Sequence, residues 1–295
     1  MSHDSDDLRD PHEPRDPRDS STGENGAIEN GADDLSDFDR GSFAHKGIVH
    51  DVFRSGEGPA VIVIAEIPGI TPKVADFARR VRALGCTVLL PVLFGEPGRE
   101  PSGRYIASSI AKACVAREFA AFATGKTAPV SEWLRALARY AHSSCGGPGV
   151  GAVGMCFTGG FALGMMAGPE MIAPVLSQPS LPIGFTAKAK ASVQLSPEDL
   201  RIVKERVAAG ACVMGLRFTG DRAVPAERFE TLRRELGEGF IGVEIDSSEG
   251  NPWGIPKNAH SVLTEHFVDE PGHPTRDAMD QVLEFFTTRL LDPPN

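Results

Sequence analysis

The sequence lacks the patterns that mark most metal-binding, disulfide-bonded and membrane-spanning proteins. Its five cysteines are odd in number and form no C-x-x-C pair or His-rich spacing, which argues against a zinc site or a disulfide framework. No apolar run approaches the length of a membrane span, and the first residues are polar, unlike a secretory signal. No glycine-rich phosphate-binding loop is present. We therefore expect a cytoplasmic protein that uses no metal and no cofactor.

The formal net charge of −10 is concentrated in one segment. Residues 1–40 contain thirteen Asp or Glu and four Arg, which leaves the rest of the chain nearly neutral. Because this segment has few large apolar side chains, we expect a disordered acidic tail, which serves either as a docking or solubilising segment or as an unselected extension. A nearly neutral body has no basic field for nucleic acid or an anionic membrane, so the expected partner is a small molecule. Both a monomer and a dimer remain open.

Residues 41–295 are expected to form one α/β domain. From residue 60 onward, short β-branched runs alternate with amphipathic stretches, which is typical of a mostly parallel central sheet with helices on both faces. The predicted strands are 60–65, 87–91, 150–154, 191–195, 212–218 and 240–245. The predicted helices are 72–84, 130–142, 157–167, 197–208, 225–236 and 275–291. In such sheets the active site forms at the carboxyl ends of the strands, so residues just after each strand are the candidates.

Cys156 is the candidate nucleophile. It lies in G-M-C-F-T-G-G at residues 154–160, where an apolar strand runs into a helix. This is the strand-turn-helix context of G-x-S-x-G with cysteine in place of serine. The helix N-terminus favours the thiolate, and the N–H of Phe157 is placed to bind an oxyanion. The alternative is a small buried cysteine at a close helix–strand contact.

Asp221 and His260 are the candidate partners of the thiol. Asp221 follows the strand at 212–218, and His260 follows the last predicted strand. The order nucleophile, acid, histidine is that of α/β-hydrolases. Asp221 could instead be an ordinary turn or N-cap residue, with Asp246 as a rival acid. His266 and His273 compete with His260.

A carboxylate ends the most apolar predicted strand. Glu66 follows V-I-V-I-A, where burial of a charge is costly unless it is hydrogen-bonded, so a functional role is expected. The N–H of Ile67 lies where the second oxyanion donor of this fold is usually found.

Four segments together resemble the dienelactone hydrolase (carboxymethylenebutenolidase) family, a family of α/β-hydrolases that open cyclic enol-lactones. The segments are A-E-I-P-G at 65–69, G-M-C-F-T-G-G at 154–160, G-D-R-A-V-P at 220–225 and A-H-S at 259–261. The resemblance runs from about residue 43 to the C-terminus. It implies a triad of Cys156, Asp221 and His260, and an oxyanion hole formed by the N–H groups of Ile67 and Phe157. It also implies that Glu66 contacts the resting thiol and takes up its proton when substrate binds.

The sequence departs from the family at its substrate-binding positions. The family's dienelactone enzymes hold the substrate carboxylate with two arginines, one shortly after the histidine. Here the residue four after His260 is Thr264, so one arginine is missing, and Arg99 or Arg104 could supply the other. An extra segment at 246–258 carries Trp253 and, together with 96–125, is expected to cover the pocket.

These residues predict a hydrolase that opens a lactone or carboxylic ester through a cysteine nucleophile and a thioester intermediate. One rival is a glutamine-amidotransferase-like or redox-sensing fold, which also pairs a strand-end glutamate with a cysteine turn but lacks the later Asp-then-His order. Another is a non-catalytic small-molecule-binding protein that keeps the pocket.

Overall fold

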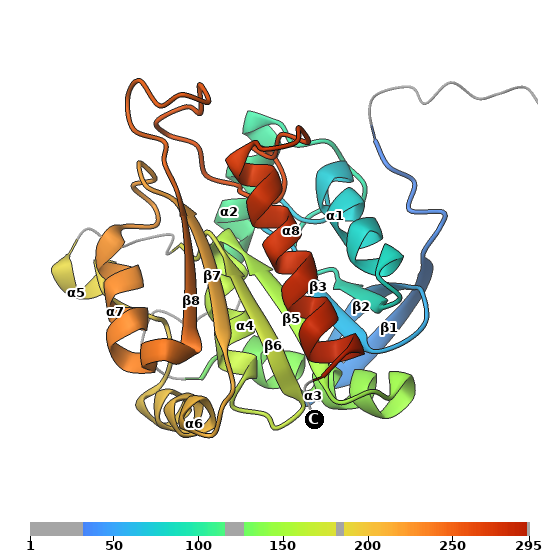
Figure 1. Cartoon of the computed structure of the whole chain (residues 1–295). Coiled ribbons are helices and arrows are strands. Elements are labelled where there is room, and N and C mark those ends of the chain that lie inside the picture. Colours follow the sequence, from blue (N-terminus) through green and yellow to red (C-terminus); the bar gives the residue numbers. More distant parts are fainter. Residues whose placement is uncertain (1–31, 116–126, 181–185, 294–295) are drawn as a thin grey trace, which may run out of the picture. The chain divides into compact units, whose positions relative to one another are not determined.

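An eight-stranded sheet forms the centre of the domain in the computed structural model, which describes residues 32–115, 127–180 and 186–293 (Figure 1). The strand order is β1-β2-β4-β3-β5-β6-β7-β8. The pairs β1–β2 and β2–β4 are antiparallel, and every other neighbouring pair is parallel. The strands are β1 (Asp39–His45), β2 (Ile48–Ser55), β3 (Ala60–Ile64), β4 (Thr87–Pro91), β5 (Val150–Met155), β6 (Met171–Ser177), β7 (Val213–Phe218) and β8 (Phe240–Ile245). The expected mostly parallel α/β sheet is confirmed.

Helices cover both faces of this sheet (Figure 1). One face packs against α1 and α8, and the other packs against α3, α4, α6 and α7. The helices are α1 (Pro72–Ala83), α2 (Gly103–Val115), α3 (Pro129–Cys145), α4 (Gly159–Met165), α5 (Ala187–Lys190), α6 (Pro197–Ala208), α7 (Ala226–Leu236) and α8 (Pro274–Phe286). A 3₁₀ turn over Cys156–Thr158 joins β5 to α4, and a π-helical turn over Thr287–Leu291 follows α8.

The side-chain pattern of β3 shows why the sequence folds into a sheet with helices packed on both faces. Val61 and Val63 point into the core beneath α1 and α8, whereas Ile62 and Ile64 point into the core beneath α3 and α4. All four side chains are fully buried. A strand buried on both faces is an almost unbroken apolar run, which is the pattern that the sequence shows.

One predicted strand is wrong. Residues 191–195 are irregular, and Gln194 in this segment has a φ of 63°. The strand between β5 and β7 is instead β6, which contains Pro174. Proline lacks the N–H that donates a hydrogen bond to a neighbouring strand, and it is rare in central strands. The proline in this segment therefore argued against predicting a strand there.

The antiparallel edge of the sheet was also missed. In β1 five of the seven residues are exposed, so the strand lacks the apolar alternation that sequence patterns detect.

The predicted boundary of the acidic tail lies too far along the chain. Leu35 and Phe38 are buried, and Asp33 and Asp37 form ion pairs with Arg79 of α1 at 2.6 and 2.7 Å. These two apolar side chains and two ion pairs fasten the segment to the domain, and β1 already begins at Asp39. Residues 1–31 lie outside the described part of the chain.

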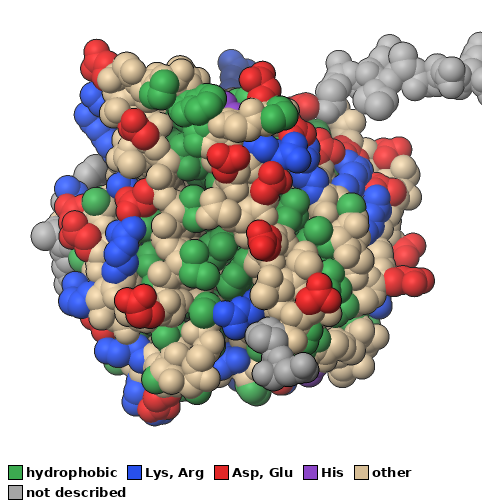
Figure 2. Space-filling view, in the orientation of Figure 1, with side chains coloured by type: hydrophobic (Ala, Val, Ile, Leu, Met, Phe, Trp, Pro, Cys, Tyr) green, Lys and Arg blue, Asp and Glu red, His purple; other side chains and the backbone are tan. Residues whose placement is uncertain are grey.

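Charges of both signs are interspersed on the face of the molecule that Figure 2 shows. This agrees with a body whose acidic and basic residues nearly balance. None of the described helices has the length and apolarity needed to cross a bilayer.

Candidate active site

Cys156 occupies a sharp turn between β5 and α4. Its φ is 54°, a left-handed conformation that side-chain-bearing residues rarely adopt and that costs of order 1–3 kcal/mol unless the surroundings enforce it. Thr158 helps to enforce it, because its Oγ1 accepts from the N–H of Met155 (2.8 Å) and donates to the carbonyl of Ile64 (2.8 Å). The buried hydroxyl thereby ties the cysteine turn to the end of β3, which leads into Glu66 and Ile67.

Two glycines let the strand and helix meet closely around this turn. A Cβ on Gly154 would lie 2.2 Å from the carbonyl oxygen of Thr158, and a Cβ on Gly159 would lie 2.7 Å from the Cβ of Pro179. Both positions therefore require glycine, which is the steric reason for the G-x-C-x-x-G pattern in the sequence.

The structure brings Asp221 and His260 together. Asp221 follows β7 and is 7% exposed, and its Oδ2 lies 2.6 Å from Nδ1 of His260. The rival Asp246 is exposed and accepts from the N–H of Ser248 instead (2.8 Å). The rival His266 accepts at Nδ1 from the backbone N–H of His260 (3.3 Å), so it supports the histidine loop. Of the two candidate acids, the structure therefore brings Asp221 and not Asp246 into contact with His260.

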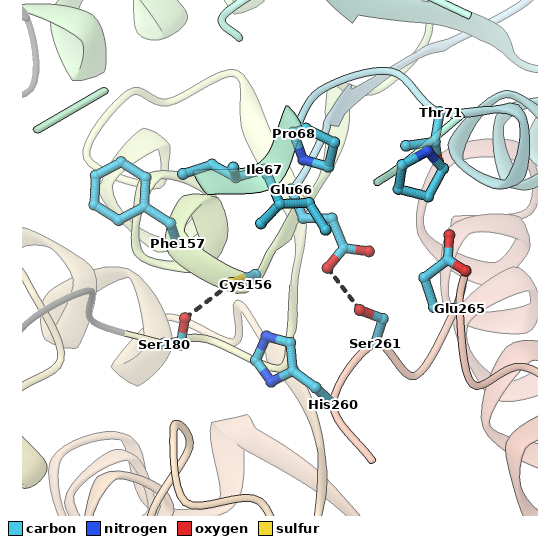
Figure 3. Close-up of a pocket in the computed structure, with 12 residues that line it drawn as sticks. Glu66, Ile67, Pro68, Thr71, Cys156, Phe157, Ser180, His260, Ser261 and Glu265 are labelled. Atoms are coloured by element: carbon cyan, nitrogen blue, oxygen red, sulfur yellow. Dashed lines mark hydrogen bonds between the residues drawn. The ribbon is translucent and has the colours of Figure 1, made fainter. Parts of the chain in front are cut away.

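Glu66 completes a cluster with the thiol and the imidazole. Donor atoms of Glu66, Cys156 and His260 all lie within 4.8 Å of one another, and the three groups converge in Figure 3. The carboxylate is buried, with Ser261 donating to Oε2 (2.7 Å) and Thr264 donating to Oε1 (2.5 Å). Oxygen, sulfur and nitrogen donors at this spacing could also ligate one metal ion, although Glu66 and His260 already have hydrogen-bond partners.

The surroundings of His260 favour its charged form. Burial of the ring lowers the pKa, but hydrogen bonds and negative charge from Asp221 and Cys156 outweigh burial and raise the pKa of His260 to about 11. The imidazole is therefore protonated at neutral pH. By linkage, this raised pKa stabilises the fold fully below the ordinary value of 6.5, and the contribution is lost as pH rises through about 11.

Replacing Cys156 with alanine is expected to lower the pKa of His260. The substitution removes one of the two hydrogen bonds and one of the two negative charges that raise the pKa, while burial still lowers it. The imidazole resonances of His260, followed by NMR from pH 5 to 11, would report the change. Cys145→Ala is the matched control, and an equal pKa of His260 in wild type and Cys156→Ala would contradict the coupling.

A cavity of about 350 Å³ opens over this cluster (Figure 3). Ile67 and Phe157, whose N–H groups are the expected oxyanion donors, both line it. The full lining is Glu66, Ile67, Pro68, Thr71, Pro101, Ile106, Cys156, Phe157, Ser180, His260, Ser261 and Glu265.

The three expected substrate-binding residues lie away from this lining. Arg99 pairs with Glu96 (2.9 Å) and stacks 4.3 Å from the ring centroid of Tyr105, and Arg104 is exposed at the start of α2. Trp253 is 50% exposed and lines a separate cavity of about 240 Å³, where its ring contacts His273. The structure does not bring these residues to Cys156. The expected cover at 96–125 lies partly outside the described residues, since 116–126 are not described.

Sequence reasoning missed two polar side chains of the site that follow β6. Ser180 Oγ lies 3.0 Å from Cys156 Sγ, and the N–H of Ser180 donates to the carbonyl of Cys156 (3.0 Å). Gln178 is buried and donates weakly to Glu66 (3.4 Å). Because β6 was not predicted, the residues after its carboxyl end were not considered as candidates.

Comparisons with known proteins agree with this fold. The sequence model of the Dienelactone hydrolase family matches residues 49–289, which is well over half of the chain. A similar solved structure is a Klebsiella pneumoniae protein named as a dienelactone hydrolase (19% identity, 85% of this chain and 98% of that chain covered, TM-score 0.56). Another is a dienelactone hydrolase from Anabaena variabilis, with 15% identity, 85% of this chain and 96% of that chain covered, and a TM-score of 0.55. A third is a dienelactone hydrolase-like promiscuous phosphotriesterase from metagenomic libraries, with 16% identity, 86% of this chain and 98% of that chain covered, and a TM-score of 0.52. A search of curated proteins found no match.

Proposed function

The chain belongs to the dienelactone hydrolase family of α/β-hydrolases, and from this we propose that it hydrolyses a carboxylic ester or lactone through a thioester on Cys156. The observation that carries the proposal is the left-handed turn at Cys156, which holds the thiol within 4.8 Å of both His260 and Glu66. Activation of a nucleophile by an oriented histidine is the arrangement that acyl transfer needs.

Acylation begins with the Cys156 thiolate attacking the carbonyl carbon. The oxyanion that forms accepts from the N–H groups of Ile67 and Phe157. When this intermediate collapses, the C–O bond of the ester breaks, and the leaving oxygen takes a proton from the His260 imidazolium. In a lactone the new hydroxyl stays attached to the acyl chain. The product is an uncharged thioester and a neutral imidazole.

Deacylation uses the change in charge that acylation causes. The thioester carries no negative charge, so the contribution of Cys156 to the raised pKa of His260 is lost. The neutral imidazole, held by Asp221, can then accept a proton from water as the water attacks the thioester. The C–S bond breaks, the thiolate is restored beside the imidazolium, and the carboxylic acid leaves.

Glu66 has a supporting place in this cycle. The resemblance assigns it the proton of the thiol, whereas the mechanism proposed here gives that proton to the imidazole of His260, whose pKa is raised. Both oxygens of Glu66 accept hydrogen bonds from hydroxyl groups, at 2.7 Å from Ser261 and 2.5 Å from Thr264. We propose that Glu66 fixes the loop after His260 through Ser261 and Thr264.

Turnover of 4-nitrophenyl esters and of aromatic lactones such as dihydrocoumarin by the purified full chain tests the proposal. We expect hydrolysis of at least one of these substrates, with loss of activity after alkylation of the thiol. Binding of these compounds without turnover would contradict the proposal and favour the non-catalytic binding protein.

A further inference from the structure

The cavity over Cys156 has a charge pattern that restricts its substrate. Two carboxylates line it, from Glu66 and Glu265, and the described lining contains no lysine or arginine. Resting on the function proposed above, we propose that the acyl group this site accepts is small and uncharged, and that Glu66 and Glu265 exclude esters with a carboxylate on the acyl chain.

Glu66 is a buried carboxylate held by neutral groups. Its side chain is 6% exposed, and its donors are the hydroxyls of Ser261 and Thr264 and the amide of Gln178. Among the described residues, no lysine or arginine forms an ion pair with it. Hydrogen bonds from these neutral donors satisfy the carboxyl oxygens but bring no cation to this side of the cavity.

Thr264 explains how this charge is left uncompensated. It lies four residues after His260, is 3% exposed, and donates from Oγ1 to Glu66. A cationic side chain here could neutralise Glu66 and hold a substrate carboxylate. The hydroxyl satisfies the glutamate and contributes no positive charge.

The nearby cations already have partners. Lys73 pairs with Glu265 (2.8 Å) at the rim, where both side chains are substantially exposed. The buried guanidinium of Arg228, behind the site, donates to backbone carbonyls, including those of Pro179 (2.5 Å) and Ser192 (2.9 Å). Within the described lining the positive charge is that of His260, whose Nδ1 is already paired with Asp221 at 2.6 Å.

The rest of the lining suits an apolar acyl group. Ile67, Pro68, Pro101, Ile106 and Phe157 supply apolar surface around a volume of about 350 Å³, at the lower end of small-molecule sites. An acyl chain here would contact these side chains and replace water with apolar contacts, whereas a carboxylate would lose its hydration without gaining a cationic partner.

A matched pair of esters tests the charge restriction. Methyl 4-nitrophenyl glutarate and mono-4-nitrophenyl glutarate share one acyl chain and one leaving group and differ in the charge at the far end. In 0.1 M salt we expect kcat/KM for the anionic ester to be about 10- to 100-fold lower than for the neutral ester, since a like charge a few ångströms away is repelled. The release of 4-nitrophenolate measures both rates.

Variants identify the responsible carboxylates through the ratio of the two rates, which cancels a general loss of activity. Glu66→Gln keeps the shape and is expected to raise the relative rate of the anionic ester about tenfold, and the more exposed Glu265→Gln about threefold. Glu270→Gln, an exposed residue outside both cavities, is the control and should leave the ratio at the wild-type value.

Each outcome of this experiment separates the two proposals. Equal kcat/KM for the two esters in the wild-type enzyme would overturn the charge restriction and leave ester hydrolysis intact. A wild-type preference that Glu66→Gln leaves unchanged would overturn the assignment to Glu66. Absence of thiol-dependent turnover of either ester would overturn the proposed function, and with it the inference that rests on it.

Discussion

Replacing Cys156 with alanine is expected to lower kcat/KM for any responsive ester by about 10⁴-fold or more. The substitution removes the atom that forms the covalent bond, and the residual oxyanion donors and His260 can promote only slow direct attack by water. Ester turnover by the purified variant measures the loss. The fold is expected to persist, because the thiol is only half-buried and its Cβ is retained.

Two comparisons make this result specific to Cys156. Cys145→Ala removes another partly buried thiol, at the end of α3, and should change kcat/KM less than about twofold. Cys156→Ser places a hydroxyl in the same turn and should retain little activity, since a serine is not held as an anion beside imidazolium. Wild-type turnover in Cys156→Ala would show that another group is the nucleophile.

Replacing Asp221 with asparagine is expected to lower kcat by about 10²- to 10⁴-fold. The Asp221 Oδ2 that holds Nδ1 of His260 at 2.6 Å would be replaced by an amide, either of whose orientations loses the charge that stabilises imidazolium. The pKa of His260 should also fall, because Asp221 contributes both a hydrogen bond and a negative charge to raising it. Steady-state kinetics across pH 6–10 measure both effects.

Asp246→Asn is the matched control for this substitution. Asp246 follows the neighbouring strand β8 and was the rival acid on sequence grounds, but it is exposed and bonds to Ser248. We expect kcat within about twofold of wild type. A larger loss in Asp246→Asn than in Asp221→Asn would reverse the assignment of the acid.

The positions of three site residues could be predicted because each follows a strand with a recognisable pattern. Glu66 follows β3, Cys156 follows β5 and Asp221 follows β7, and parallel strands bring these ends to one edge of the sheet. The glycines at 154 and 159 revealed the close contact around the thiol, which the positions of Thr158 and Pro179 now explain.

The rest of the site depends on contacts that no local pattern encodes. Ser180 and Gln178 follow a strand that contains a proline, so the strand and its end were missed together. The sequence showed Thr264 only as the residue that stands where the family has an arginine. Its hydrogen bond to Glu66 depends on how the loop after His260 folds back toward the end of β3. Long-range packing of this kind joins residues almost two hundred positions apart.

The loop residues illustrate a different limit. Trp253 was expected to shape the pocket because it lies in an inserted segment at the active-site edge. In the structure it lines a neighbouring cavity, and Glu265 lines both. Sequence position gave the correct edge of the sheet but not the direction in which the loop folds.

The most direct test of a cysteine nucleophile is the position of the acyl group in enzyme quenched with acid during turnover of an activated ester. Cleavage after Glu170 separates Cys156 from Ser180, whose hydroxyl lies 3.0 Å from the thiol and is the nearest alternative acceptor. We predict an acyl adduct on Cys156 that neutral hydroxylamine removes, as it removes thioesters, and no adduct in Cys156→Ala. A hydroxylamine-resistant adduct on Ser180 would contradict the account.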